Sequence, residues 1–508
     1  MVFSTTLFIF LFLPLFLLGY YLLPFRWRSA WILLASYAFY GWWRVDFLAL
    51  IVLTSLWTDF FGRIIARSLR TKPQQARLAL GLGVGLNLLT LAYFKYADFG
   101  IDSLNAIVQL LGGSGFGNAN VILPIGISFY IFQASSYLID IYRQDARPAD
   151  NILDLAAYIA LFPQLIAGPI LRYKTLSQQF RRRSHSFAAF NEGSLRFMTG
   201  FCKKVLIADS VAPLANASFA LAAPSMADAW LGTLAYSVQL YFDFSGYSDM
   251  AIGLGLMMGF RFPENFDHPY ISKSISEFWR RWHISLSTWL RDYLYVPLGG
   301  NRLGRRRTYV NLLLVMLLGG LWHGAAWTFV LWGAWHGLML ALERYYHENQ
   351  QGNAAQGNTT RNQLPRWLTV WQTARTMLIV MLGWVTFRAV DFGGAMAVYA
   401  GMLGLQGLAI SEALAWQLSY FSLLMLGLAL LLIYLSPWLR RCWQPPPSPS
   451  LSSPSMPRQT ASGTSVAAVS GGVSGWLANL ELLIIPLFAL SVLRLAANTF
   501  SPFLYFQF

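Results

Sequence analysis

Long apolar runs recur from one end of the chain to the other, and short polar or basic segments separate them. Residues 3–23 contain no charged side chain and have about the length that a helix needs to cross a bilayer. Comparable runs predict further embedded helices over residues 29–43, 47–61, 78–94, 121–142, 193–214, 230–244, 309–330, 376–387, 418–435 and 476–495. Several runs are short for a straight span, so we expect tilted, broken or re-entrant helices among them. The pattern predicts an all-α polytopic membrane protein with roughly 11 to 13 embedded helices.

Two polar segments interrupt this pattern and divide the chain. Residues 348–365, rich in Asn and Gln, predict a polar loop, and residues 445–475, rich in Pro, Ser, Gly and Ala, predict a disordered linker. They separate the N-terminal transmembrane helices (1–115) and a central block (120–347) from the C-terminal helices (366–508). No internal repeat is visible in the sequence, which disfavours a transporter built from inverted repeats.

Composition and charge agree with a membrane protein and indicate its orientation. The 508 residues are 56% hydrophobic and only 12% charged, whereas soluble domains carry roughly 25% charged residues. The net charge is +15, but the basic residues flank apolar runs and form no aromatic-interleaved stripe for nucleic acid. The basic clusters that we expect in the cytoplasm are 26–28, 63–77, 172–183, 302–307 and 440–441. An inner-membrane protein is therefore expected, with a retained first helix whose N-terminus lies outside.

Residues 272–297 combine aromatic and charged side chains in a helical pattern. Ile275, Phe278, Trp282, Leu286, Trp289 and Tyr293 recur every three or four residues and predict one apolar face. At 100° per residue, Arg280, His283 and Arg291 fall on the opposite, polar face. The pattern predicts one helix lying at the membrane interface, either as a simple anchor or as part of a site.

A second histidine lies within an apolar helix. His323 follows Tyr309 by fourteen residues, which places it roughly 20 Å along a helix from the basic cluster at 302–307. An ionisable residue at that depth is costly and indicates a functional site, although a hydrogen-bonded packing histidine is the alternative. Gly319, Gly320, Gly324 and two alanines surround it, leaving room for a substrate or another helix. His336, thirteen residues on, would lie about 140° around a continuous helix and is expected to support the site or the packing.

The chemistry available to such a histidine is proton transfer. A neutral imidazole inside a membrane can take a proton from a hydroxyl or return one to a leaving thiolate. Acyl transfer also needs donors for the developing oxyanion, which an indole N–H, an arginine or backbone amides could supply. The sequence has no G-x-S-x-G elbow, and no histidine pair has zinc-site spacing, so we expect neither an esterase module nor a metal.

Three long motifs resemble the membrane-bound O-acyltransferase family, abbreviated MBOAT. They are residues 240–270, the run E-F-W-R-R-W-H-I-S-L-S-T-W-L-R-D-Y at 277–293, and G-G-L-W-H-G-A-A-W at 319–327. The likeness extends to residues 123–133, 162–169 and 501–508, and so covers most of the chain. It is greatest to members that acetylate exported polysaccharides such as alginate, and weaker to members that transfer D-alanine to teichoic acid.

The resemblance implies a ring of tilted helices around a central funnel, with His323 and His283 as catalytic residues. Candidate supporting or substrate-binding residues in the same motifs are Trp322, Arg280, Arg291, Asp292, His336 and Asp243. The implied reaction takes acetyl from a cytoplasmic thioester, acetyl-CoA, with no bound cofactor, and periplasmic SGNH-type acetyltransferases would complete transfer to the polymer.

The polymer itself stays open. The Ser/Pro-rich insertion at 445–475 leaves the motifs intact but keeps another polymer, such as cellulose, as an alternative to alginate. A transporter or flippase, or a scaffold subunit of a polysaccharide export complex, would use the same apolar helices without acyl transfer.

Overall fold

The computed structural model describes residues 1–354, 365–443, 474–497 and 503–504, and these residues form helices and no strand. The N-terminal helices are α1 (Leu13–Leu22), α2 (Phe25–Gly41), α3 (Asp46–Ser68) and α4 (Pro73–Leu110). The central helices are α5 (Ile127–Tyr142), α6 (Ile152–Ile159), α7 (Phe162–Leu165), α8 (Tyr173–Arg181), α9 (Phe187–Cys202), α10 (Asp209–Phe219), α11 (Met226–Met257), α12 (Ile275–Arg281), α13 (Ile284–Leu290), α14 (Arg305–His323) and α15 (Trp327–Ala354). The C-terminal helices are α16 (Arg366–Arg388), α17 (Phe392–Met402), α18 (Glu412–Ala415), α19 (Tyr420–Trp443) and α20 (Ser474–Ala497). Four short turns of other helix types are η1 (Phe8–Phe12), η2 (Lys203–Ala208), η3 (Pro269–Ile271) and η4 (Arg291–Tyr295).

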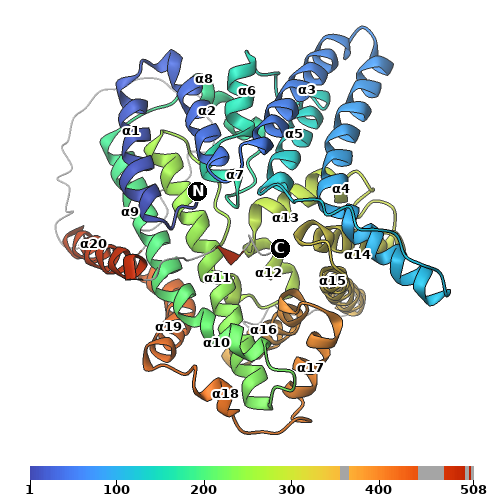
Figure 1. The fold of residues 1–508 in the computed structure, drawn as a ribbon, viewed down its shortest axis with the longest axis vertical. Helices are drawn as coiled ribbons and strands as arrows, with labels where there is room; N and C mark the ends of the chain where they lie inside the picture. Colours follow the sequence, from blue (N-terminus) through green and yellow to red (C-terminus); the bar gives the residue numbers. More distant parts are fainter. Residues whose placement is uncertain (355–364, 444–473, 498–502, 505–508) are drawn as a thin grey trace.

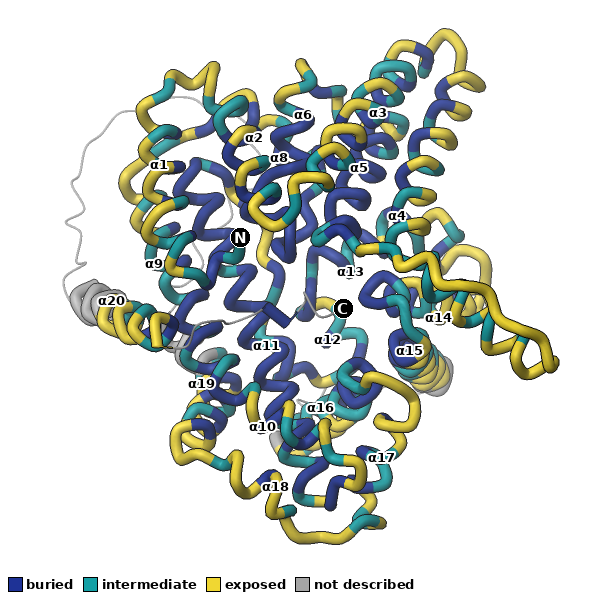
Figure 2. The backbone as a smooth tube through the Cα atoms, viewed as in Figure 1, coloured by how far each residue is buried: buried dark blue, intermediate teal, exposed yellow. Residues whose placement is uncertain are grey.

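Helix α11 runs through the middle of the molecule and is buried along most of its length (Figures 1 and 2). Helices α9 and α10 pack along it. In Figure 1, α1 to α3 and α6 lie toward the top, α4 lies beside α14 at the right, and α16 and α17 lie toward the bottom. Gly200 of α9 and Gly246 of α11 face each other at a close approach of the two backbones. A Cβ atom built on Gly200 would lie 2.4 Å from the Gly246 carbonyl oxygen, so this contact requires glycine.

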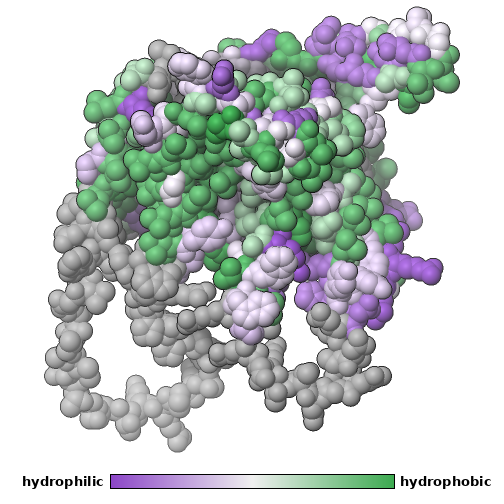
Figure 3. Space-filling view, turned by 90° about the horizontal axis from the view of Figure 1, so that it is seen from below, coloured by the Kyte–Doolittle hydropathy of each residue, from purple (hydrophilic) through white to green (hydrophobic). Residues whose placement is uncertain are grey.

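Large apolar side chains are exposed over the outer helices, as expected where lipid replaces water. Leu53, Leu56 and Phe60 of α3 and Leu82 and Leu89 of α4 are all more than half exposed. Figure 3 shows a face of the molecule on which hydrophobic residues predominate. A monomer in water rarely exposes so much apolar surface, so these faces indicate membrane-embedded helices.

Three described helices are long and apolar enough to cross a membrane by themselves: Asp46–Ser68, Pro73–Leu110 and Trp367–Arg388. Further apolar helices are shorter, at Phe8–Leu22, Ile152–Leu165, Phe392–Met402, Tyr420–Leu435 and Leu483–Ala497. Short and broken helices agree with the expectation drawn from the short apolar runs. The predicted total of embedded helices stays a prediction.

One hydrophobic core joins the three blocks that the sequence suggested. Its buried residues run from Phe3 in the first block, through the central helices, to Phe503 and Leu504 near the end of the chain. The predicted linker 445–475 lies almost wholly outside the described residues, as does most of the predicted loop 348–365. The N-terminal and C-terminal helices therefore both pack on the central block that carries the two histidines.

Candidate functional site

His323 is the last residue of α14, at the bend of a helical hairpin. The predicted helix over 309–330 is not continuous, because Gly324 is extended (φ −157°, ψ 151°) and α15 begins only at Trp327. Helix α15 then runs back along α14. His323 is 5% exposed and contacts the rings of Trp322, Trp332 and Phe387, with centroids 5.0–5.2 Å away.

The small residues around His323 make room for protein. A Cβ atom on Gly320 would lie 2.2 Å from the Phe329 carbonyl oxygen, and one on Gly324 would lie 2.0 Å from the Phe329 ring. Of the two possibilities left open by the sequence, the structure shows the approach of another helix at these positions. The glycines thus bring α15 close enough for Trp332 to pack on His323.

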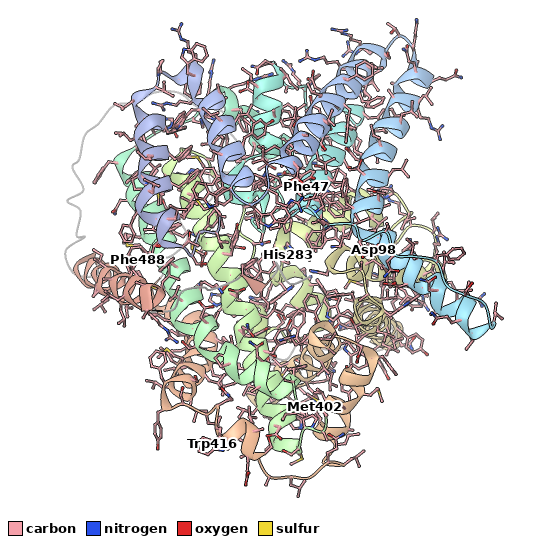
Figure 4. The ribbon with its side chains drawn as sticks, in the orientation of Figure 1. Phe47, Asp98, His283, Met402, Trp416 and Phe488 are labelled. Carbon is pink, nitrogen blue, oxygen red and sulfur yellow. The ribbon has the colours of Figure 1, made fainter. Side chains whose placement is uncertain are left out.

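His283 does not lie on a polar helix face, and the prediction of one helix over 272–297 is wrong. Helix α12 ends at Arg281, Trp282 is extended, and His283 is left-handed (φ 43°, ψ 53°) before α13 begins. The break turns the imidazole into the protein, where His283 is 0% exposed (Figure 4). The predicted apolar residues Trp282, Leu286 and Trp289 are buried, so the apolar pattern was right although the helix is interrupted.

Asn265, in the loop after α11, holds the break in place. Its backbone carbonyl accepts the Ile284 amide (2.9 Å), and its side-chain oxygen accepts the Ser285 amide (3.2 Å). That oxygen also lies 3.1 Å from His283 Nδ1. Since an amide oxygen only accepts, Nδ1 carries the ring proton and Nε2 is left as the acceptor. Nε2 has no hydrogen-bond partner among the described residues.

The two histidines, 40 residues apart in sequence, meet inside the protein. The His283 and His323 ring centroids are 6.4 Å apart, and the Trp322 ring lies 6.0 Å from His283. Phe244 of α11 packs edge-on against His283 at 4.7 Å. Three elements that the sequence analysis treated separately thus build one buried site.

Two cavities both reach His323. The larger, about 480 Å³, is lined by Trp322, His323 and residues that include Phe39, Trp43, Lys95 and Leu123. The smaller, about 100 Å³, is lined by His323 and by apolar residues of α13 to α15 that include Leu290, Val315, Met316 and Trp332. His323 thus stands between two spaces, while the single central funnel stays a prediction.

His336 does not line either cavity and packs behind the Trp332 ring. Because the chain turns back at Gly324, the expected 140° offset on a continuous helix is wrong. His336 is 0% exposed and packs against Trp279 and Trp332, with centroids 5.3 and 5.0 Å away. The Trp332 ring contacts both His336 and His323.

The charged candidates lie apart from the histidines. Arg280 is exposed, and Arg291 is exposed and paired with Asp292. Asp292 also accepts from Arg172 at 2.6 Å. Burial alone would raise the pKa of the Asp292 carboxyl, but hydrogen bonds from Arg291 and Arg172 outweigh it and hold that pKa below its usual value. Asp292, Arg291 and Arg172 therefore form an ion-pair group near the surface.

Asp243 is buried in α11, and its contacts indicate a structural role. Its carboxylate pairs with Lys204 at 2.8 Å and accepts the Leu504 amide at 2.8 Å. Lys204 pairs in turn with Asp209. Asp243 thus ties the end of the chain to η2 and α11, one residue from the Phe244 that packs on His283.

Comparison with known proteins identifies the chain. A sequence profile of the MBOAT, membrane-bound O-acyltransferase family, matches residues 142–383, which include His283 and His323. Over 100% of both chains, the protein is 51% identical to the probable alginate O-acetylase AlgI of Pseudomonas putida. The chain belongs to the membrane-bound O-acyltransferase family.

More distant MBOAT relatives carry other names. The chain is 38% identical to the peptidoglycan O-acetyltransferase of Helicobacter pylori over 81% of each chain. It is 28% identical to the teichoic acid D-alanyltransferase of Bacillus subtilis, over 54% of this chain and 70% of the relative. The protein is thus a membrane-embedded O-acyltransferase, which sets aside a pure carrier or scaffold.

Sequence reasoning missed Asn265 and Lys95. Asn265 lies within the long motif at 240–270, but nothing in its spacing indicates that it reaches a histidine 18 residues away. Lys95 lies at the end of the apolar run 78–94 and outside the matched family segment. A single lysine there is a recognisable signal, because an ionisable residue in an embedded helix is costly unless it has a role.

We predict that His283→Ala lowers acyl transfer, but less than loss of His323 does. The His283 imidazole is held in one tautomer near His323, the expected catalytic base, so its removal should disturb proton transfer or substrate orientation and leave that base in place. Asn265→Ala should reproduce part of the loss, because it releases Nδ1. Acetylation rates of both variants at equal protein level check this, and a fully active His283→Ala protein would contradict it.

Proposed function

We propose that the protein moves acetyl groups from a cytoplasmic thioester, acetyl-CoA, across the bacterial inner membrane for O-acetylation of an exported polysaccharide such as alginate. Three relatives named above modify alginate, peptidoglycan and teichoic acid, which are all polymers outside the cytoplasm. Periplasmic acetyltransferases of the SGNH type would then complete transfer to the sugar hydroxyls.

The observation that carries this proposal is the position of His323 between the two cavities. The larger cavity is lined by Trp43 and Lys95. They adjoin segments 44–46 and 96–102, which lie at the far ends of apolar runs that start at the basic clusters 26–28 and 63–77, so we expect these segments outside. The smaller is lined by Val315 and Met316, on the α14 segment between His323 and the basic cluster expected in the cytoplasm. A donor from one side and an acceptor from the other would meet at one imidazole.

In the proposed reaction, the acceptor hydroxyl attacks the thioester carbonyl while His323 takes the hydroxyl proton. The carbon–sulfur bond then breaks, and the thiolate leaves with the proton returned from His323. The Trp322 indole N–H is buried and has no protein partner among the described residues, so it supports a role as an oxyanion donor. The enclosing Trp and Phe rings keep water from competing as the acceptor.

We predict that the loop before α14 faces the cytoplasm. Leu303, 62% exposed, is a suitable reporter position, whereas Thr308 within the same basic segment is buried. In a variant lacking the native cysteines, Leu303→Cys should resist a membrane-impermeant maleimide in intact spheroplasts and react after permeabilisation. Leu111→Cys, 80% exposed after α4, is the outward control and should react in both. Labelling of Leu303→Cys in intact spheroplasts would contradict the cytoplasmic position of this loop and the proposed direction of acetyl transfer.

Complementation tests the proposed function. The gene is expressed in an alginate-producing bacterium that lacks its own alginate O-acetylase, and the acetyl content of the secreted alginate is measured by proton NMR. We expect acetylation to be restored. Unacetylated alginate, with the protein present in the inner membrane, would overturn the assignment to alginate.

A further inference from the structure

Helix α14 ends among buried residues inside the protein, and the backbone carbonyls at its end need partners. The last four carbonyls of any α-helix have no partner within the helix, and leaving them bare in an apolar surrounding is costly. Here Gly320 O accepts from the Gly324 amide at 3.3 Å. The carbonyls of Leu321, Trp322 and His323 remain.

Two consecutive residues of α4 supply those three partners. The Tyr96 hydroxyl donates to Leu321 O at 2.7 Å. The Lys95 amine donates to Trp322 O and, at 3.1 Å, to His323 O. It also lies 3.4 Å from the Ser128 hydroxyl at the start of α5. The last three carbonyls of α14 are therefore capped by side chains about 225 residues away in sequence.

The capping side chain also suits the electrostatics of the helix end. A helix C-terminus carries about half a negative charge, and Lys is a preferred residue beside it. The Lys95 amine lies 5.9 Å from the Trp322 ring centroid, within the range of a cation–π contact. Lys95 also lines the larger cavity beside His323. Because this cap is built from α4, the position of the His323 backbone depends on how α4 packs.

We propose that Lys95 is a positioning residue for His323: it fixes the backbone at the α14 end so that the imidazole is held between the two cavities. This inference rests on the proposed function of His323. Lys95 acts through the carbonyls of Trp322 and His323, and Tyr96 plays a lesser part because its carbonyl partner, Leu321, is two residues earlier.

Four variants test this in the alginate complementation assay. Lys95→Met removes the donors and should lower the initial acetylation rate roughly ten- to a hundredfold, the scale expected when a catalytic group is misplaced by about 1 Å. Lys95→Arg keeps the donors and should recover at least about a third of the wild-type rate. Tyr96→Phe should keep more than about half. Lys95→Gln keeps an N–H donor for folding but is shorter, and should lie between Lys95→Met and Lys95→Arg.

Protein level and the melting temperature of each purified variant are measured beside the rate. A wild-type rate in Lys95→Met, or in a folded Lys95→Gln if Lys95→Met does not insert, would overturn the positioning role. So would a loss in Lys95→Met that follows a lowered melting temperature and is not recovered by Lys95→Arg. If His323→Ala is inactive while Lys95→Met is fully active, the positioning role of Lys95 is wrong and the proposed function of His323 stands. Wild-type activity in His323→Ala would contradict the proposed function of His323 itself.

Discussion

His323→Ala should bring polymer acetylation down to background while the protein still inserts into the membrane at the wild-type level. General-base catalysis contributes roughly 10²- to 10⁴-fold to the reaction rate. Among the described residues, His323 alone lines both cavities, so no second imidazole is placed to replace it. The packing should survive, because Trp332, Phe387 and Trp322 enclose the position and α14 is capped through its backbone.

His336→Ala is the matched control for that result. It removes a buried imidazole from the same aromatic cluster, but one that lines neither of the two cavities. We expect His336→Ala to retain more acetylation than His323→Ala in the same strain. Equal losses in the two variants would indicate that packing of the cluster, rather than proton transfer at His323, decides activity.

Lys204→Met should destabilise the fold by about 3–5 kcal/mol, the usual cost of removing one partner from a buried ion pair. Lys204 and Asp243 are 4% and 2% exposed at their side chains, and Asp243 also holds the Leu504 amide. With the lysine gone, a buried carboxylate loses its cation. Adding Asp243→Asn should recover most of the loss, since the amide is neutral and its oxygen still accepts from Leu504.

The nearby Lys203→Met variant is the control for this stability prediction. Lys203 pairs with Asp249 at a more exposed position, and Asp249 keeps Arg196 as a second partner. Lys203→Met should therefore lower the free energy of unfolding by about 1 kcal/mol or less. Urea unfolding in detergent measures the stability of the three variants and of the wild type. Equal stability of Lys204→Met and wild type would show that the pair contributes little to the fold.

The position of His323 along its helix could be predicted from the sequence because it follows from local rules. An uninterrupted apolar helix begins at a basic cluster, and the helical rise places the histidine far along it, which is where α14 ends. The apolar positions of 272–297 could be predicted for the same reason, since burial follows the 3.6-residue period whether or not the helix is continuous.

The break at His283 could not be predicted in this way. The residues around it favour a helix locally, and the left-handed turn is stabilised by Asn265, whose backbone and side chain accept the first amides of α13. Similarly, the α14 cap comes from α4, so its contacts have no local sequence signal. Both features depend on how distant segments pack, which periodicity does not report.

Acetyl transfer across a sealed membrane tests the central claim most directly. Right-side-out vesicles are prepared from the alginate-producing strain that lacks its own alginate O-acetylase and expresses either wild-type or His323→Ala protein. They are loaded with acetyl-CoA labelled in the acetyl group and incubated with external alginate and the periplasmic proteins of that strain. We predict label in the external alginate for the wild type and background label for His323→Ala. Equal labelling by the two proteins would contradict transfer through His323.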